Sequence, residues 1–433
     1  MADGVPLHVA DLWIRGGRIA SIGRPPDGAS VPDQTIDAGD CYVLPGFVQT
    51  HLHLVQTLIR NEAEEMPLLE WLRRAVWPFE AAHDEFTIRA AARTGIAECI
   101  HSGVTTIFDM GTTHGHEFIF DELIQSGIRA VSGKAMMDLD LDGSAPLRLR
   151  ETTHESLASA ELLASKFDGA ADGRIRYCYA PRFALSATPE LHREVARRAK
   201  ATNRRIHTHA SEQLAEVAAV TKQFGKSCIR YLHSAGLADA GWTIAHGIHV
   251  DGEEIQLIKN ANAGVAHCPT SNLKLGSGIC NVPLLRANGV AVGLGSDGAP
   301  CNNRLDLFRE MSLACLLQKR DGNIQSLPAR DVVRMATIEG AHAIGMDSEI
   351  GSLAIGKRAD VIVIDPRLPS TSPGRDPYTT IVHAASPENV RDVICDGEVL
   401  KLNFVATRFD PREIAMLARD AGEKLRVRAE SVV

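Results

Sequence analysis

The sequence lacks the features that mark several large classes of protein. Its 433 residues contain no uninterrupted apolar run of about 18 residues, so no transmembrane helix is expected. The glycines and prolines follow no fixed period, which excludes collagen. Residues 1–4 do not begin a basic stretch followed by an apolar core, so secretion is not expected. Because 45% of the residues are hydrophobic and 23% are charged, the chain can bury a core, and wholesale disorder is excluded.

The net charge indicates which binding partners to expect, and the cysteines indicate the cellular compartment. The chain has 46 basic and 54 acidic residues, a net charge of −8 with histidine neutral. An acidic chain offers no broad basic surface for nucleic acid, and no polybasic segment for a membrane surface is present. The nine cysteines are odd in number and show no disulfide framework, which is typical of a reducing compartment. We therefore expect a cytoplasmic protein that binds a small molecule and neither nucleic acid nor membrane.

Both ends of the sequence are rich in predicted strands. Residues 10–23 and 390–400 alternate apolar and polar side chains around a central turn, and each segment predicts a β-hairpin. Shorter strands are predicted at residues 41–44 and 359–364. The length of the chain exceeds that of a typical domain, so one large domain with a smaller one is expected.

The middle of the sequence alternates predicted strands with predicted helices, such as those at residues 190–202, 212–224 and 253–260. Eight strands in such a pattern favour a (β/α)8 barrel, with a doubly wound sheet as the alternative. The strands are the run that ends at residue 51 and residues 104–108, 129–137, 174–180, 205–209, 242–246, 264–267 and 290–295. We predict an α/β fold: a TIM-type barrel over residues 46–345 and a small β-sandwich domain built from both termini, residues 1–45 and 346–433.

Histidine and acidic residues gather where these strands end. His51 and His53 lie two residues apart on the first strand, so both side chains point to one face and can meet one metal ion. His209 closes the fifth strand, His246 closes the sixth, and Asp297 follows the eighth. In a barrel these strand ends share the carboxyl-terminal rim, where active sites are built. Their joint placement predicts a metal site at that rim.

The other histidines leave several interpretations open. His207 is expected to point away from the metal or to support a ligand rather than to bind the ion itself. His249 lines the pocket or caps the following helix, and His267 is as well suited to the pocket as to the core. His114 and His116 fall in a glycine-rich loop, where we expect exposure to solvent.

Several motifs together resemble those of the amidohydrolase superfamily. Residues 44–53, LPGFVQTHLH, are similar to its PGFVxxHxH signature. The strand-rich ends resemble the small composite domain of that family, and residues 351–360 resemble its usual C-terminal return to that domain. The resemblance covers nearly the whole chain, and it continues through residues 209–212 (HASE), 245–247 (AHG), 267–274 (HCPTSNLK) and 295–298 (GSDG).

Within this superfamily the chain resembles the single-metal deaminases, which include guanine deaminases, adenosine-type nucleoside deaminases and s-triazine hydrolases. Members with two metals carry a lysine at the end of strand four, whereas residues 179–182 here are YAPR. The resemblance implies one divalent metal per chain, with zinc expected and iron(II) as the rival. It also implies a homo-oligomer. The implied metal ligands are His51, His53, His209 and Asp297.

The resemblance implies a hydrolysis that releases ammonia from an aminated N-heterocycle. Asp297 would take a proton from the attacking water, and His246 would orient the nucleophile or stabilise the tetrahedral centre. Glu212 would protonate a ring nitrogen and then help the amine to depart. A barrel that has lost catalysis and serves in assembly is a remote alternative, which the intact ligand set disfavours.

The substrate signals conflict. Gln56, Arg182 and Phe183 resemble positions of guanine deaminases, and a buried guanidinium needs an acceptor such as a ring carbonyl. We therefore predict a lactam ring, as in guanine or a pterin. Residues 66–72 resemble nucleoside deaminases instead, in which the position of Glu80 contacts a ribose, although those enzymes usually have histidine where Arg182 stands.

The alternatives are a deaminase of nucleosides such as S-adenosylhomocysteine or methylthioadenosine and an s-triazine hydrolase. The predicted substrate contacts are Gln56, Glu80, Arg182, Phe183 and His249.

Overall fold

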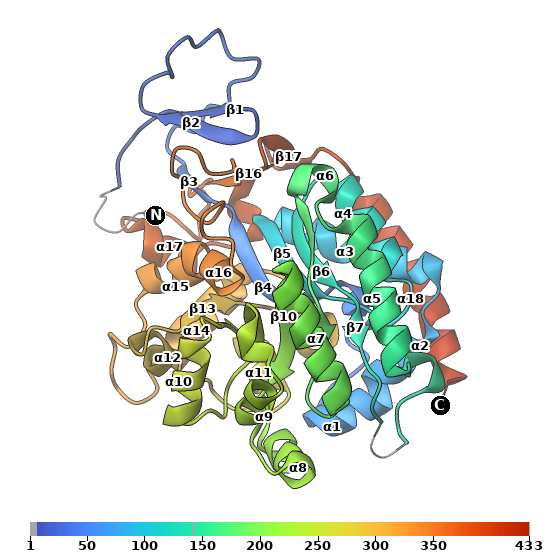
Figure 1. The fold of residues 1–433 in the computed structure, drawn as a ribbon. Helices are drawn as coiled ribbons and strands as arrows, with labels where there is room; N and C mark the ends of the chain where they lie inside the picture. The colour runs from blue at the N-terminus through green and yellow to red at the C-terminus, as the bar shows by residue number, and fades with distance from the viewer. Residues whose placement is uncertain (1–6, 141–142, 433) are drawn as a thin grey trace.

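The computed structural model describes residues 7–140 and 143–432, and its centre is a closed barrel of eight parallel strands (Figure 1). The sheet runs in the order β10-β11-β12-β13-β4-β5-β6-β8. Tyr179 closes the ring, because its N–H donates to the Arg205 carbonyl at 3.0 Å and its carbonyl accepts from the His207 N–H at 2.8 Å. The strands are β4 (Phe47–His53), β5 (Val104–Met110), β6 (Arg129–Gly133), β8 (Ile175–Tyr177), β10 (Ile206–Ala210), β11 (Trp242–His246), β12 (Gly264–His267) and β13 (Ala291–Leu294).

This closure confirms the predicted barrel over the doubly wound sheet. Every residue of β4 and β5 is buried, as expected for strands covered on both faces. Helices including α3 (Glu85–His101), α5 (Thr153–Phe167), α7 (Pro189–Thr202) and α10 (Gly252–Asn260) surround the strands (Figure 1). Helix α8 (Leu214–Phe224) begins two residues later than predicted, and Glu212 therefore lies in the loop that follows β10.

The strands from the two ends of the chain combine in a small β domain, as predicted. An antiparallel sheet has the order β18-β17-β16-β15-β3, so the N-terminal strand β3 pairs with the C-terminal strand β15. The predicted hairpin β1–β2 forms a separate two-stranded sheet that projects from the body (Figure 1). The strands of this domain are β1 (Leu12–Arg15), β2 (Arg18–Ile22), β3 (Tyr42–Pro45), β15 (Val361–Ile364), β16 (Val390–Cys395), β17 (Glu398–Leu402) and β18 (Val405–Ala406).

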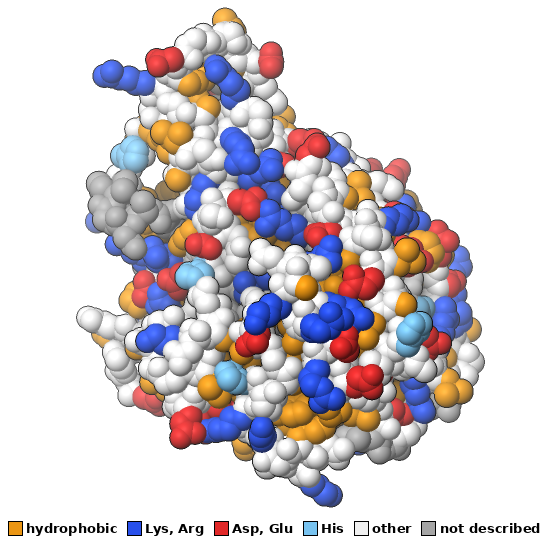
Figure 2. Space-filling view, viewed as in Figure 1, with side chains coloured by type: hydrophobic (Ala, Val, Ile, Leu, Met, Phe, Trp, Pro, Cys, Tyr) orange, Lys and Arg blue, Asp and Glu red, His pale blue; other side chains and the backbone are white. Residues whose placement is uncertain are grey.

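The long C-terminal helix α18 (Pro411–Glu430) packs against the barrel. Its buried Leu425 and Ala429 contact Ile59 and Ala82, and the Arg428 guanidinium binds Asp84 at 2.9 Å. The chain thus crosses from the small domain back to the barrel after β18. In the described part of the chain, no helix is both long and apolar enough to cross a membrane. Basic and acidic side chains are interspersed on the face shown in Figure 2.

A buried ion pair joins the barrel to the small domain. Arg129, on β6, is fully buried, and its Nε and Nη2 atoms donate to the two carboxylate oxygens of Asp360 at 2.8 and 3.0 Å. Asp360 also accepts from the backbone N–H of Asp396 at 2.8 Å, in the turn between β16 and β17. One carboxylate therefore links a barrel strand to the turn of a hairpin in the small domain.

Replacement of Asp360 should strongly destabilise the fold. In an Asp360→Ala variant, Arg129 keeps a contact of 3.2 Å with Asp396 but loses its two-point partner in the core. Breaking a buried ion pair on one side typically costs about 3–5 kcal/mol, and we expect a loss near the lower value. Urea unfolding measures this loss. Glu423→Ala, which breaks an exposed pair with Arg426 on α18, is the control and should be indistinguishable from the wild type. Equal stability of the two variants would contradict a stabilising role for the pair between Arg129 and Asp360.

Candidate functional site

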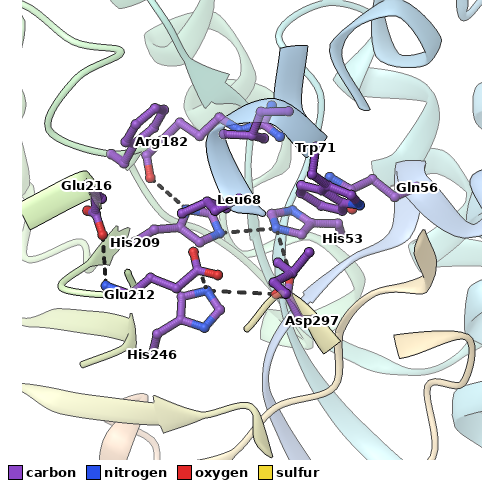
Figure 3. Close-up of a pocket in the computed structure, with 13 residues that line it drawn as sticks. His53, Gln56, Leu68, Trp71, Arg182, His209, Glu212, Glu216, His246 and Asp297 are labelled. Atoms are coloured by element: carbon purple, nitrogen blue, oxygen red, sulfur yellow. Dashed lines mark hydrogen bonds and ion pairs between the residues drawn. The ribbon is translucent and has the colours of Figure 1, made fainter. Parts of the chain in front are cut away.

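The four predicted metal ligands meet at the carboxyl end of the barrel. His51 and His53 come from the end of β4, His209 comes from β10, and Asp297 lies just after β13 and pairs with β4. One ligand atom from each residue lies within 4.8 Å of every other. Figure 3 shows the side chains of His53, His209 and Asp297 converging on one point.

The spacing of the donor atoms suits a metal ion. The Nε2 atoms of His53 and His209 are 3.2 Å apart, and Asp297 Oδ1 lies 3.3 Å from Nε2 of His53. The same oxygen lies 3.3 Å from Nε2 of His51. Ligands around a tetrahedral ion with bonds of about 2.0–2.1 Å are separated by about 3.3–3.4 Å. The three separations are therefore those expected between ligands that share one ion.

The outer ring nitrogens fix which nitrogen faces the centre. His53 Nδ1 donates to the Met110 carbonyl at 2.7 Å, and His209 Nδ1 donates to the Arg182 carbonyl at 2.7 Å. Burial holds the pKa of His209 well below its ordinary value, so its ring carries no second proton. The Nε2 atoms of His53 and His209 face each other across 3.2 Å, and a cation between them would bind both.

Three site residues leave their strands in a left-handed backbone conformation. Ser211, His246 and Asp297 have φ angles of 57°, 74° and 62°. This region is costly for residues with a side chain, and such residues cluster at functional sites. Each turn occurs where a strand ends at the rim, and it presents His246, Asp297 and the Glu212 that follows Ser211 to the centre.

Glu212 and His246 form a proton-carrying pair beside the metal ligands. Glu212 Oε2 lies 3.4 Å from His246 Nε2, and Nδ1 of His246 lies 2.9 Å from the Asn272 side-chain oxygen. Burial raises the pKa of Glu212 to about 7. Burial also opposes the charged form of His246, but the carboxylates of Glu212 and Asp297 outweigh it and raise the histidine pKa. The pair can therefore hold a proton near neutral pH.

A cavity of about 420 Å³, including its open mouth, lies over these groups. One side is polar and the other is apolar. Of the five predicted substrate contacts, Gln56, Arg182 and Phe183 line the cavity, whereas Glu80 and His249 are not among its lining residues. The cavity is lined by His53, Gln56, Leu68, Trp71, Leu72, Arg182, Phe183, His209, Glu212, Glu216, His246, Leu275 and Asp297 (Figure 3).

Arg182 already has an acceptor in the protein. Its Nη1 and Nη2 atoms donate to the two oxygens of Glu80 at 2.5 and 3.1 Å, and Gln56 Nε2 donates to Glu80 at 2.8 Å. All three side chains are buried. The expectation that Arg182 needs a ring carbonyl of the substrate is therefore wrong, because Glu80 neutralises it from behind the cavity wall. His249 is likewise engaged, through Nε2, with the Ser277 carbonyl at 2.8 Å.

The remaining histidines differ in part from expectation. His116 is buried rather than exposed, with Nε2 at 3.0 Å from Ser132 Oγ, and His114 is half-buried. His267 is buried, and neither of its ring nitrogens has a hydrogen-bond partner among the described residues. His207 lies behind the site, with Nε2 at 2.9 Å from His51 Nδ1, in the supporting position that was one of its two expected placements.

Sequence reasoning missed Glu216 and the apolar wall. One oxygen of Glu216 accepts from the backbone N–H of Glu212 at 2.8 Å, which steadies the loop that carries Glu212. Its signal was a capping box at Gln213 and Glu216, at the start of α8. Leu68 and Trp71 lie in the segment 66–72 that resembles nucleoside deaminases, but they were not predicted to line the cavity, because apolar residues at helical spacing usually indicate core.

Comparison with known proteins identifies the family. The model of the amidohydrolase family matches residues 42–400. The chain belongs to the amidohydrolase family. This amidohydrolase is 38% identical, over 95% of its length and 93% of the relative, to a 5-methylthioadenosine/S-adenosylhomocysteine deaminase of Haloarcula marismortui. It is 36% identical, over 96% and 93%, to a 5'-deoxyadenosine deaminase of Methanobrevibacter smithii.

A solved structure shares the fold closely. An adenosine deaminase from Xanthomonas campestris with bound zinc has a TM-score of 0.90 and 28% identity, covering 98% of this chain and 95% of that one. The predicted superfamily is thus confirmed, and this amidohydrolase is a hydrolase acting on C–N bonds.

The ligand cluster predicts about one equivalent of divalent metal per chain. Elemental analysis of the purified protein measures it. His209→Ala should lose most of the metal, because it removes one of four donors, whereas Glu212→Gln should retain it. Two equivalents per chain, or full activity after exhaustive chelation, would contradict a single essential ion.

Proposed function

We propose that this amidohydrolase is a metal-dependent deaminase of adenosine-type nucleosides, including those modified at the 5' position. The observation that carries the proposal is the similarity, over nearly the whole chain, to proteins named as deaminases of 5-methylthioadenosine, S-adenosylhomocysteine and 5'-deoxyadenosine. The closed pairing of Arg182 with Glu80 supports it, because the guanidinium no longer requires a lactam oxygen. The predicted guanine-like or pterin-like ring is accordingly set aside.

Zinc is the proposed metal. The donor set of three neutral imidazoles and one carboxylate suits zinc, and the similar adenosine deaminase was solved with zinc bound. His51, His53, His209 and Asp297 would hold the ion. When bound, it would supply a Lewis acid that makes water nucleophilic at neutral pH.

The side chains around the cavity have complementary roles in this proposal. Asp297 turns Oδ1 toward His51 and His53, while Oδ2 accepts from Ser271 at 2.7 Å and is placed to take a proton from the attacking water. Glu212 gives its proton to a ring nitrogen, which lets the ring accept electron density as the water oxygen bonds to carbon. His246 orients the nucleophile. Asp297 passes the first water proton to the departing amine, which leaves as ammonia, and the second water proton returns to Glu212 as the hydroxyl becomes the ring carbonyl.

The apolar wall would hold the base and exclude water. Leu68, Trp71 and Leu72 come from one short helical stretch, α1 (Leu68–Trp71) and the turn after it, and Phe183 and Leu275 complete the wall. Aromatic and aliphatic side chains bind the faces of a purine without demanding further hydrogen bonds. Exclusion of water strengthens each electrostatic contact with the reacting ring.

The proposed substrate class is tested by a screen for ammonia release. We expect adenosine, 5'-methylthioadenosine or 5'-deoxyadenosine to be deaminated with a kcat/KM about 10²–10⁴ above that for guanine or a pterin, because Glu80 occupies the Arg182 donors that a lactam oxygen would need. Turnover of guanine or a pterin without turnover of any nucleoside would restore the lactam interpretation. Turnover of aminotriazines alone would indicate a triazine hydrolase.

Glu212→Gln should keep the metal and lose about 10²–10⁴ in kcat, the usual scale for a general acid–base group. The protonated carboxyl is the active form, and it loses its proton as the pH rises through about 7. The kcat/KM of the wild type should therefore fall on the alkaline side of about pH 7, and this limb should be absent from the residual activity of the variant. A variant that loses its metal would mean that Glu212 is a ligand instead.

A further inference from the structure

The outer ring nitrogens of the three ligand histidines have two kinds of hydrogen-bond partner. His53 and His209 each donate from Nδ1 to a backbone carbonyl, which no side-chain substitution removes. His51 instead faces a side chain, because its Nδ1 lies 2.9 Å from Nε2 of His207. Among the described residues, His207 is thus the one side chain that supports a ligand histidine at its outer nitrogen.

His207 is rigidly placed for this contact. It lies on β10 two residues before His209, is fully buried, and donates its backbone N–H to the Tyr179 carbonyl at 2.8 Å in the seam that closes the barrel. Its ring stacks on Phe108 with centroids 4.1 Å apart, and it meets the His51 ring edge-on at 4.8 Å. Its Nδ1 has no hydrogen-bond partner in the residues described, so its polar contact is directed at His51.

We propose that His207 is a positioning residue of the metal site, which accepts a hydrogen bond from His51 Nδ1 and so turns the Nε2 lone pair of His51 toward the ion. Without an acceptor there, His51 can carry its proton on Nε2, where it blocks the metal. An outer partner of this kind typically contributes 10–100-fold to metal affinity. The inference concerns the metal centre and is independent of which nucleoside is the substrate.

Two variants distinguish the loss of the hydrogen-bond acceptor of His207 from the loss of its side-chain volume. Gln at position 207 retains an acceptor oxygen near the place of Nε2, whereas Phe retains the ring that stacks on Phe108 but has no acceptor. We expect His207→Phe to raise the zinc Kd by about 10–100-fold and His207→Gln to restore most of the affinity. Competition of the metal-free protein with a chromophoric chelator gives the Kd. Thermal unfolding of the metal-free form reports folding separately.

The matched control is His192→Phe. His192, on α7, is also fully buried, but its Nδ1 lies 3.1 Å from the Thr188 carbonyl and 3.2 Å from the Tyr231 hydroxyl rather than beside a metal ligand. This variant should bind zinc with the affinity of the wild type. Wild-type affinity in His207→Phe, or an equal loss in His207→Gln and His207→Phe, would overturn the proposal. If Phe prevents folding, His207→Leu replaces it under the same criteria.

Discussion

The Nε2 atoms of His53 and His209 face each other across 3.2 Å at the carboxyl end of the barrel, and the surrounding structure holds them there. The carbonyls of Met110 and Arg182 fix the tautomers, and burial keeps the pKa of His209 well below its usual range. Strand β4 is fully buried and β10 is buried except at His209, so the closed sheet keeps both rings in place, and a cation between them would bind both.

The same rim places a protonated carboxyl beside a carboxylate. The pKa of Asp297 lies well below its usual value: burial opposes the charged form, but the neighbouring rings of His51 and His53 outweigh this effect. Glu212 is equally buried, but its burial is not compensated to the same extent, and its pKa rises to about 7. Two acidic side chains with different environments can therefore accept and give protons in one reaction.

The barrel and the ligand set were predictable because each leaves a local signal. An i, i+2 pair such as His51 and His53 fixes a shared strand face, and strand ends share one rim. The contact of Arg182 with Glu80 left no local signal in the sequence, because the two residues are 102 positions apart and each could pair with another residue. The burial of His116 was missed for a similar reason: a loop next to glycine resembles solvent-exposed sequence until its packing on Ser132 is known.

Arg182 shows how chemistry and specificity are separated in this site. Its backbone carbonyl supports the metal ligand His209, while its side chain holds Glu80 and lines the cavity. A substitution of the side chain changes the wall but leaves the carbonyl in place. An exchange of the arginine for another side chain would therefore leave the metal support of His209 in place. The partner Glu80 then limits the exchange, because a buried carboxylate without a cation is costly. A replacement of Arg182 by a neutral side chain therefore requires a matching replacement of Glu80.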